Sequence, residues 1–171
     1  IILLAVHILQ MLGLQDLQLK INSVGCPNCR PVYRKKLQEY FRPHLAELCE
    51  DCQSRFERNP MRILDCKVPA CKAVATGAPH LADSLCDECK AHFEGLQKLL
   101  TAEGIKYTLD PNLVRGLDYY TKTAFEIQYA ALGAQSAVCG GGRYDGLVAQ
   151  IGGPPTPEIG FAMGLERLLL A

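Results

Sequence analysis

The spacing of the cysteines is the feature that most restricts how this chain can fold. Eight of its nine cysteines form four close pairs along the sequence: Cys26/Cys29, Cys49/Cys52, Cys66/Cys71 and Cys86/Cys89. Isolated buried thiols would not be expected to pair in this way, and a disulfide framework is typical of secreted chains, which nothing in this sequence indicates. A C-x-x-C turn supplies two thiolates to one metal ion, so we favour zinc. The alternative is that some pairs are reduced thiols inherited from a zinc-binding ancestor.

The distance between pairs restricts which of them can share an ion. Apolar residues follow a helical period after Pro31, and a single helix over residues 31–48 would be about 27 Å long. Thiolates on one tetrahedral zinc lie within about 4 Å of each other. The pairs at the two ends of that helix therefore cannot share a site unless Pro43 reverses the chain. We predict two sites, one of Cys26, Cys29, Cys86 and Cys89, the other of Cys49, Cys52, Cys66 and Cys71.

The hydrophobic pattern predicts helices and strands in alternation. One half-buried strand is indicated by alternate residues on one face: Thr123, Phe125, Ile127 and Tyr129. Helices are expected over residues 1–12 and from Ser84, which has capping-box spacing to Asp87, to about Gly104. Further strands are expected at 17–22, 105–109, 135–139 and 159–164. The fold class is therefore mixed α/β (α+β), with a mostly helical, cysteine-rich stretch at about 25–104.

Composition describes an ordinary soluble globular chain. Its 171 residues are 49% hydrophobic and 21% charged with a formal net charge of zero, which gives no support for a broad nucleic-acid-binding surface but leaves room for a local one. No stretch reaches the roughly 18 apolar residues of a membrane span. Three arginines, Arg55, Arg58 and Arg62, are a candidate nucleic-acid contact, although a solvated face is the preferred interpretation. His44 and His92 could replace a thiolate, but surface or packing roles are simpler.

Polar recognition groups are concentrated just before the predicted strand at 123–129. Arg115 is followed closely by Gly116, Asp118, Tyr119 and Tyr120. A guanidinium suits phosphate or carboxylate, glycine allows the backbone to approach a ligand, and adjacent tyrosines on a strand would point to opposite faces. The alternative is the rim of a sheet with a solvated arginine.

Two further stretches have the composition of a binding site. The triplet Gly140–Gly142 follows a short predicted strand, and Arg143, Tyr144 and Asp145 come directly after it. Three glycines can bring bare backbone against a ligand, although an isolated triplet is also typical of a mobile turn. Near the end of the chain, Glu166 and Arg167 open a predicted helix, where a phosphate would find backbone N–H groups and a guanidinium.

Three of these stretches together resemble the histidyl-tRNA synthetase family, a class II aminoacyl-tRNA synthetase family. LVRGLDYY at 113–120, followed by T-x-T-A-F-E, resembles its histidine-specific motif. CGGGRYDGL at 139–147 resembles its second histidine-pocket block, and IGFAMGLERLLLA at 159–171 resembles the third class II motif. With INSVGC near the start, the resemblance covers essentially the whole chain, and three motifs in order are highly specific.

The resemblance implies a function for each of the singled-out residues. Histidine and ATP with magnesium would give histidyl-adenylate, and the histidyl group would then pass to tRNA(His). By match to the motifs, Arg115 would hold the α-phosphate and the histidine carboxylate and stabilise the charge of the transition state. The histidine pocket would be formed by Tyr119, Tyr120, Tyr144, Gly140, Gly141 and Gly142. Arg167 would bind the ATP phosphates.

The resemblance also implies a domain organisation. Residues 1–24 and 105–171 would belong to the catalytic core, with its antiparallel sheet, and residues 25–104 to an inserted helical domain. The chain is expected to be an internal fragment from after the second class II motif to the third, without the dimer-forming first motif or an anticodon-binding domain. Alone it would be inactive; the parent would be a cytoplasmic homodimer.

Two alternatives have different functions. One is a synthetase-like regulatory subunit of histidine biosynthesis, a non-enzyme with the same fold, against which an intact Arg115, Tyr119 and Tyr120 argue. The other is a zinc-dependent RNA-binding module in which residues 25–104 have the main function. Bound zinc and tRNA affinity of that stretch would distinguish it from a synthetase core.

Overall fold

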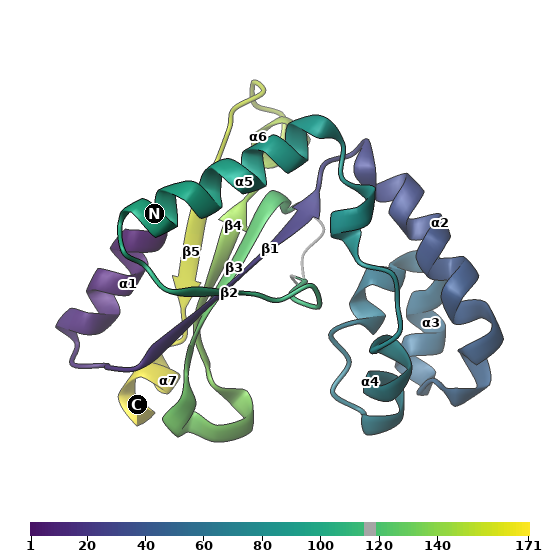
Figure 1. Ribbon diagram of the computed structural model, residues 1–171, viewed down its shortest axis with the longest axis horizontal. Helices are drawn as coiled ribbons and strands as arrows, with labels where there is room; N and C mark the ends of the chain where they lie inside the picture. Colours follow the sequence, from purple (N-terminus) through teal and green to yellow (C-terminus); the bar gives the residue numbers. More distant parts are fainter. Residues whose placement is uncertain (115–118) are drawn as a thin grey trace.

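A computed structural model describes residues 1–114 and 119–171 of the chain. Its centre is a five-stranded sheet in the order β2-β1-β3-β4-β5, and a group of short helices lies to one side of it (Figure 1). The neighbours are antiparallel except β1 and β2, which are parallel. The strands are β1 (Leu17–Gly25), β2 (Tyr107–Leu109), β3 (Thr121–Tyr129), β4 (Ala137–Arg143) and β5 (Ile159–Met163).

Two helices cover one face of the sheet. Side chains of α1 (Ile2–Met11) and α5 (Asp87–Ala102) share one hydrophobic cluster with β1, β3 and β4. The alternation in the sequence selects this face, because Ile21, Phe125 and Ile127 are fully buried in the cluster. The helix end predicted at about Gly104 is confirmed, since Gly104 has positive φ after α5 ends, and Gly13 has positive φ in the same position after α1.

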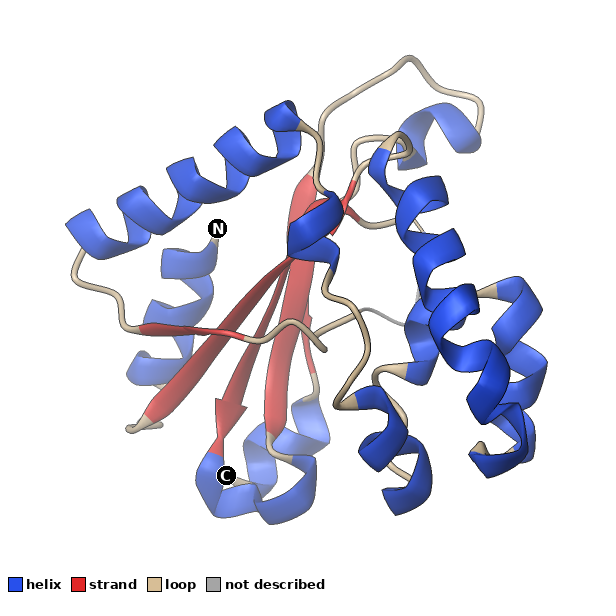
Figure 2. Ribbon diagram, turned by 45° about the vertical axis from the view of Figure 1, so that its right-hand side comes forward, coloured by secondary structure: helices blue, strands red, loops and turns tan. Residues whose placement is uncertain are grey.

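The short helices form a second unit, which we call the helical lobe (residues 29–84). Figure 2 shows it beside the sheet. It has its own hydrophobic cluster, whose largest fully buried side chains include Tyr33, Leu37 and Phe41. Its elements are α2 (Cys29–Phe41), η1 (Arg42–Glu47), α3 (Glu50–Arg58), η2 (Pro60–Ile63), α4 (Pro69–Ala75) and η3 (Leu81–Ser84).

Two of the predicted helices are wrong in their bounds. The helix expected over 31–48 ends at Phe41 and continues as the 3-10 segment η1, with Pro43 in its first turn. Proline has no N–H for the helical hydrogen bond and its ring clashes with the preceding turn, so an α-helix cannot continue there. The capping box at Ser84 is also wrong, because α5 begins at Asp87 with Cys86 as its N-cap. The Ser84 hydroxyl instead accepts a hydrogen bond from Lys36.

The strand predictions are confirmed in existence but displaced in their bounds. β3 begins only at Thr121, so Tyr119 and Tyr120 precede it. The whole triplet Gly140–Gly142 lies within β4, an interior strand between β3 and β5, which excludes a mobile turn. The remaining elements are η4 (Ala130–Gln135), α6 (Leu147–Gln150) and α7 (Leu165–Leu170). Within the described residues, no helix is long and apolar enough to cross a membrane.

The predicted division into three domains stays a prediction. Within the stretch at 25–104, α5 packs against the sheet through Leu100, with Phe93 and Leu96 beside it, whereas α2, α3 and α4 pack on one another. A third, small buried cluster of Cys26, Cys29 and Cys89 lies at the start of α5.

Candidate functional site

Small residues line the middle of the sheet face that α1 and α5 leave open. Residues directly opposite each other on antiparallel strands point to the same side, and Ala124 lies opposite Gly142, which lies opposite Gly160. In the next row Gly140 lies opposite Ala162. These small residues form a floor with little side-chain bulk, in which Ala124, Gly140 and Gly142 are themselves buried and Glu126 lies opposite Gly140. Two glycines of the predicted triplet belong to this floor, whereas Gly141 pairs with Phe125 of the covered face.

Three tyrosines gather at one end of the floor. The ring centroids of Tyr119 and Tyr120 are 4.8 Å apart, and that of Tyr144 lies 5.8 and 6.0 Å from them. The glycines make room for these rings, because a Cβ on Gly142 would approach Tyr120 Cδ1 to 2.9 Å and one on Gly160 would approach the Tyr144 hydroxyl to 2.4 Å. The prediction that Tyr119 and Tyr120 point to opposite faces is wrong, because both precede the strand whose alternation would separate them.

Polar residues of β1 hold the segment that leads to the predicted arginine. The Asn22 side-chain amide donates to the carbonyls of Pro111 and Leu113, at 3.2 and 3.0 Å. Lys20 forms an ion pair with Asp110, with 3.3 Å between Nζ and Oδ2. These interactions fix the approach to Arg115, which itself lies outside the described residues. Nothing in the sequence pattern distinguished Asn22 and Lys20 from ordinary exposed strand residues.

A second polar group lies beside Tyr144. Arg143 Nη1 donates to Asp145 Oδ1 at 2.8 Å, and the same oxygen accepts the backbone N–H of Glu158 at 3.1 Å. Among the described residues, Arg143 Nε and Glu158 Oε2 are buried without a hydrogen-bond partner. Buried polar atoms of this kind normally have a hydrogen-bond partner, and these two lie at the end of the floor next to Tyr144. No pattern in the sequence pointed to Glu158.

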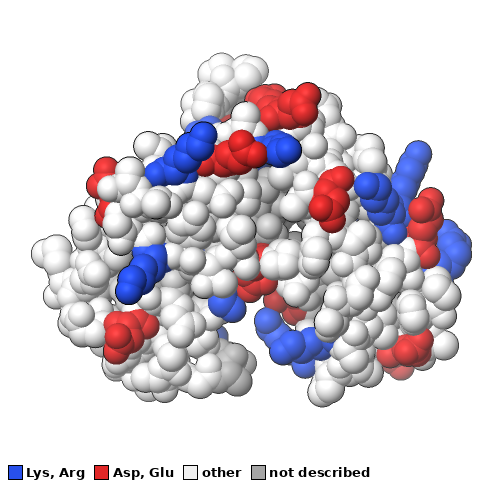
Figure 3. All heavy atoms as spheres, viewed as in Figure 1, with Lys and Arg blue, Asp and Glu red and all other residues white. Residues whose placement is uncertain are grey.

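A cavity of about 340 Å³ lies between the helical lobe and the tyrosines. Four arginines line it, Arg30, Arg34, Arg58 and Arg62, together with Tyr120 and Val114. Arg30 Nε donates to the Val24 carbonyl at 3.1 Å, and Arg34 donates to the Glu57 carbonyl. Figure 3 shows basic side chains beside the notch between the two units. Arg58 and Arg62 thus line a hollow, which a simple solvated face would not provide, while Arg55 is not among its lining residues.

Arg167 lies away from the tyrosines. β5 runs antiparallel to β4, so Ile159 lies beside Arg143 and Met163 beside Cys139, about 13 Å further along the strand. Arg167 belongs to α7, which follows that far end, and its side chain folds over Gly164. Tyr144, a predicted histidine-binding residue, and Arg167, a predicted phosphate-binding residue, therefore lie near opposite ends of β5.

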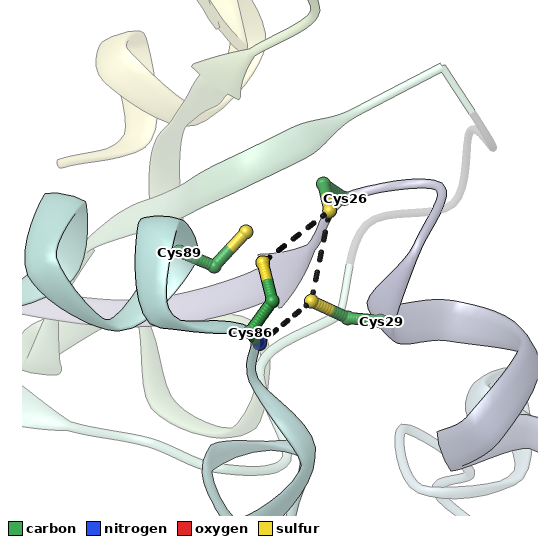
Figure 4. A group of neighbouring side chains, drawn as sticks. All are labelled: Cys26, Cys29, Cys86 and Cys89. Atoms are coloured by element: carbon green, nitrogen blue, oxygen red, sulfur yellow. Dashed lines mark hydrogen bonds between the residues drawn. The ribbon is translucent and has the colours of Figure 1, made fainter.

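The eight paired cysteines form two groups. In the group that we call the neck group (Cys26, Cys29, Cys86 and Cys89), the sulfur atoms all lie within 4.8 Å of one another. Figure 4 shows them converging from the end of β1, the start of α2 and the start of α5. The Cys26 sulfur lies 3.6 Å from that of Cys29 and 3.8 Å from that of Cys86, and the backbone N–H of Cys86 donates to the Cys29 sulfur at 3.1 Å.

The second group, which we call the lobe group, repeats this arrangement inside the helical lobe. Its sulfur atoms also lie within 4.8 Å of one another, with 3.9 Å between Cys49 and Cys66. The backbone N–H of Cys49 donates to the Cys71 sulfur at 3.1 Å. The members are Cys49, Cys52, Cys66 and Cys71. The structure thus brings together the same pairs that the spacing argument grouped, although the helix in that argument is shorter than expected.

The thiols differ in how readily they ionise. Burial raises the pKa of the Cys52 and Cys89 thiols. Burial also opposes ionisation of Cys26, but backbone N–H groups of Cys29 and Asn28 outweigh it and lower the pKa of that thiol to about 7. His44 contacts Glu47 and His92 contacts Thr123, so neither histidine belongs to a cysteine group.

Comparison with known proteins gives a consistent result. The family model for histidyl-tRNA synthetase matches residues 30–168. The histidine–tRNA ligase of Desulfitobacterium hafniense is 62% identical over 160 residues, covering 94% of this chain and 38% of its own length. That of Moorella thermoacetica is 59% identical over 171 residues, covering 100% of this chain and 40% of its own. The chain spans about two fifths of the length of these curated relatives.

Solved structures agree with these relatives. The apo histidyl-tRNA synthetase of S. aureus superposes with a TM-score of 0.74 at 44% identity, covering 99% of this chain and 41% of that one. A Bacillus halodurans protein described as an ATP phosphoribosyltransferase regulatory subunit/histidyl-tRNA synthetase has a TM-score of 0.61 at 24% identity, covering 99% of this chain and 48% of its own. The second likeness concerns the fold alone. The predicted α/β class is confirmed by the first.

Proposed function

Because this chain belongs to the histidyl-tRNA synthetase family, we propose that it supplies the histidine pocket of a histidine–tRNA ligase. The ligase activates histidine with ATP and Mg²⁺ and transfers it to tRNA(His) in the cytoplasm, where cysteines stay reduced. The observation that supports this most directly is the cluster of Tyr119, Tyr120 and Tyr144 at the end of a floor of glycines. We also propose, from the resemblance, that the full-length ligase is a homodimer.

The chemistry of the tyrosine cluster suits an imidazole. Flat aromatic rings provide stacking surfaces, and each hydroxyl can donate or accept a hydrogen bond. The floor of Gly140, Gly142 and Gly160 lets the substrate approach the backbone, and the buried Arg143 and Glu158 atoms beside Tyr144 offer one donor and one acceptor. Such a pocket would bind a small polar aromatic amino acid and exclude larger ones.

Roles that depend on charge follow from the motif match. Arg115 would stabilise the negative charge that develops on the α-phosphate during adenylate formation, and Arg167 would bind the ATP phosphates. Both were identified by resemblance, and Arg167 follows the end of β5 that lies farther from Tyr144. In a full-length ligase, Arg115→Ala should lower the adenylation rate by about 10²–10³.

The histidine pocket can be tested by adding one methyl group to its floor. In a full-length ligase carrying this chain, Gly160→Ala should raise the KM for histidine in ATP–pyrophosphate exchange, because the new Cβ would displace the Tyr144 hydroxyl. Tyr144→Phe should raise it by about 3–10-fold, the effect of removing one hydrogen bond. The matched control is Gly95→Ala, where a Cβ meets nothing within 4 Å. An unchanged KM for histidine in both pocket variants would refute the assignment.

We propose further that the arginine-lined cavity binds phosphate groups of tRNA(His). Four guanidinium groups around one hollow beside Tyr120 provide the charge and geometry that phosphates require. Arg58→Gln and Arg62→Gln should each weaken tRNA binding and reduce its dependence on salt by about one ion for each phosphate that is no longer bound. Arg55→Gln is the matched control, because Arg55 lies on the same helix as Arg58 but does not line the cavity.

The alternative function, a regulatory subunit of histidine biosynthesis, has the same fold, but the likeness to a protein described as such a subunit is at 24% identity. The curated relatives at 62% and 59% identity are histidine–tRNA ligases. A full-length protein that binds histidine without any ATP–pyrophosphate exchange would favour the regulatory alternative. We expect the 171-residue chain alone to show no exchange, because no match to the ATP-binding second class II motif is found in its sequence.

A further inference from the structure

The neck and lobe groups share a local geometry that packing alone does not require. In each, a C-x-x-C begins a helix: Cys86 is the N-cap of α5 and Cys49 is the N-cap of α3. In each, the backbone N–H of that N-cap cysteine donates to a sulfur of the other pair at 3.1 Å. Such N–H groups stabilise negative charge on sulfur. The same thiolate-binding arrangement is therefore built twice, from different segments.

The distances between sulfur atoms fit one tetrahedral ion in each group. Zinc–sulfur bonds of about 2.3 Å place neighbouring thiolates of a tetrahedron about 3.8 Å apart. Three of the sulfur–sulfur separations are 3.6 and 3.8 Å in the neck group and 3.9 Å in the lobe group, and all the others lie within 4.8 Å. Disulfides need about 2.05 Å, and all of these cysteines are free. An iron–sulfur cluster would hold the sulfurs further apart, because each binds a different iron.

From this geometry we infer that the chain binds two structural zinc ions, one in each cysteine group. All four ligands of each site come from protein thiolates, which leaves no open position for catalysis. The ions are distinct from the Mg²⁺ that accompanies ATP, and they have different structural roles because the two groups lie at different points of the fold.

The neck ion closes the base of the helical lobe. The chain leaves the sheet through Cys26 and Cys29 and returns to it through Cys86 and Cys89, so one ion joins both crossings (Figure 4). The arginine-lined cavity lies on this boundary, with Val24 and Tyr120 on the sheet side and Arg58 and Arg62 on the lobe side. The neck ion therefore holds the lobe in the orientation that forms the cavity.

The lobe ion replaces part of a hydrophobic core. It joins the starts of α3 and α4 to the segment after η2, and Cys52 and Cys71 are fully buried among Leu37, Phe41 and Ile63. The longest helix of the lobe has 13 residues, and the others are shorter. Small units of short helices usually need a metal or another crosslink for stability. The lobe ion supplies it.

Metal analysis of the 171-residue chain, purified without chelator, tests both sites. We expect two zinc ions per chain. Cys66→Ala and Cys89→Ala should each retain one ion, and the double variant none. Cys139→Ala is the matched control, because Cys139 is a buried cysteine of β4 outside both groups, and it should retain two. Absence of zinc, iron in its place, or two ions retained in Cys66→Ala would overturn the inference.

A second measurement keeps the test decisive where a variant fails to fold. In the unmodified chain, Co²⁺ should replace zinc at two equivalents, each giving the charge-transfer and visible bands of tetrahedral thiolate coordination. Zinc should protect eight of the nine cysteines from a thiol reagent. Cys139 is the ninth, and its protection should depend only on its burial in the sheet. Saturation at one equivalent, or bands of octahedral Co²⁺, would refute the two-site arrangement.

The two roles are separable by hydrogen exchange. Cys66→Ala should lose amide protection within the helical lobe while the sheet keeps its own. Cys89→Ala should leave the lobe core protected and loosen only the segments at the neck and the cavity, including Val24 and the start of α2. Identical exchange patterns in the two variants would refute the distinction between neck and lobe ions.

Discussion

The sheet and the helical lobe both bury large apolar side chains, but they hold them in place differently. In the sheet, Phe125 and Ile127 lie on a strand whose backbone is hydrogen-bonded on both sides, and α1 and α5 cover them. In the lobe, Tyr33 and Phe41 lie on short helices joined by 3-10 turns. Long-range strand pairing surrounds the first core, whereas four cysteines from three segments converge inside the second. We therefore expect a bound metal ion to affect the stability of the lobe much more than that of the sheet.

Metal removal should separate the two units most strongly. A chelator should unfold the helical lobe while the sheet persists, since structural zinc contributes on the order of 10 kcal/mol in small metal-dependent folds. Hydrogen exchange followed by mass spectrometry would show protection lost over residues 29–84 and kept in β1 and β3. Zinc added back should restore protection, and Mg²⁺ should not. Simultaneous loss of protection in both units would show that they unfold as one.

A matched pair of core truncations should give the next largest effect. Phe41 and Phe125 are both fully buried, and Phe→Ala in a core costs about 3–5 kcal/mol. We expect Phe125→Ala to lower the free energy of unfolding of the sheet. Phe41→Ala should loosen only the lobe, and less so when zinc is present. Val32→Ala, on an exposed position of α2, is the control. Urea denaturation followed by exchange in each unit would check this.

Lowering the pH should give the smallest effect, confined to the sheet. Burial, and then the positive charges of Arg143 and Lys122, lower the pKa of His92, whose Nε2 lies 3.0 Å from Thr123 Oγ1. As the pH falls, His92 is therefore protonated in the unfolded chain before it is protonated in the folded chain. The contribution of His92 to the free energy of unfolding is fully present above the ordinary pKa of about 6.5, and it is lost as the pH falls through the lowered pKa of the folded chain. The acidic groups that act in the opposite direction are Asp145 and Glu88.

This pH effect can be assigned to one side chain. Urea midpoints of the sheet at pH 7 and pH 5 should differ less in His92→Gln than in the unmodified chain. His44→Gln, which changes a partly exposed histidine of the lobe, should leave the difference as it was. A pH dependence that survives in His92→Gln would have to come from other groups.

Much of the fold was predictable because it depends on local pattern. Alternating residues selected the buried face of β3, and Gly13 and Gly104 marked helix ends that need positive φ. The predicted helix bounds were wrong where two local signals competed. At Pro43 the α-helix gives way to a 3-10 segment, and Ser84 accepts a hydrogen bond from Lys36 instead of capping α5. The three motifs identified the family, because their residue types in that order are specific even without coordinates.

The sequence by itself determined the family, the strand faces and which cysteines are near neighbours along the chain, because each depends on residue identity and short spacing. Only the tertiary structure decided how distant segments meet. Strand register placed Gly142 beside Gly160 and made a floor of small residues. The packing of the lobe against the sheet brought Arg58 and Arg62 to the same cavity as Tyr120. Those interactions join residues far apart in the chain. Their free energies depend on the packing of the whole fold and cannot be inferred from the sequence pattern of either segment.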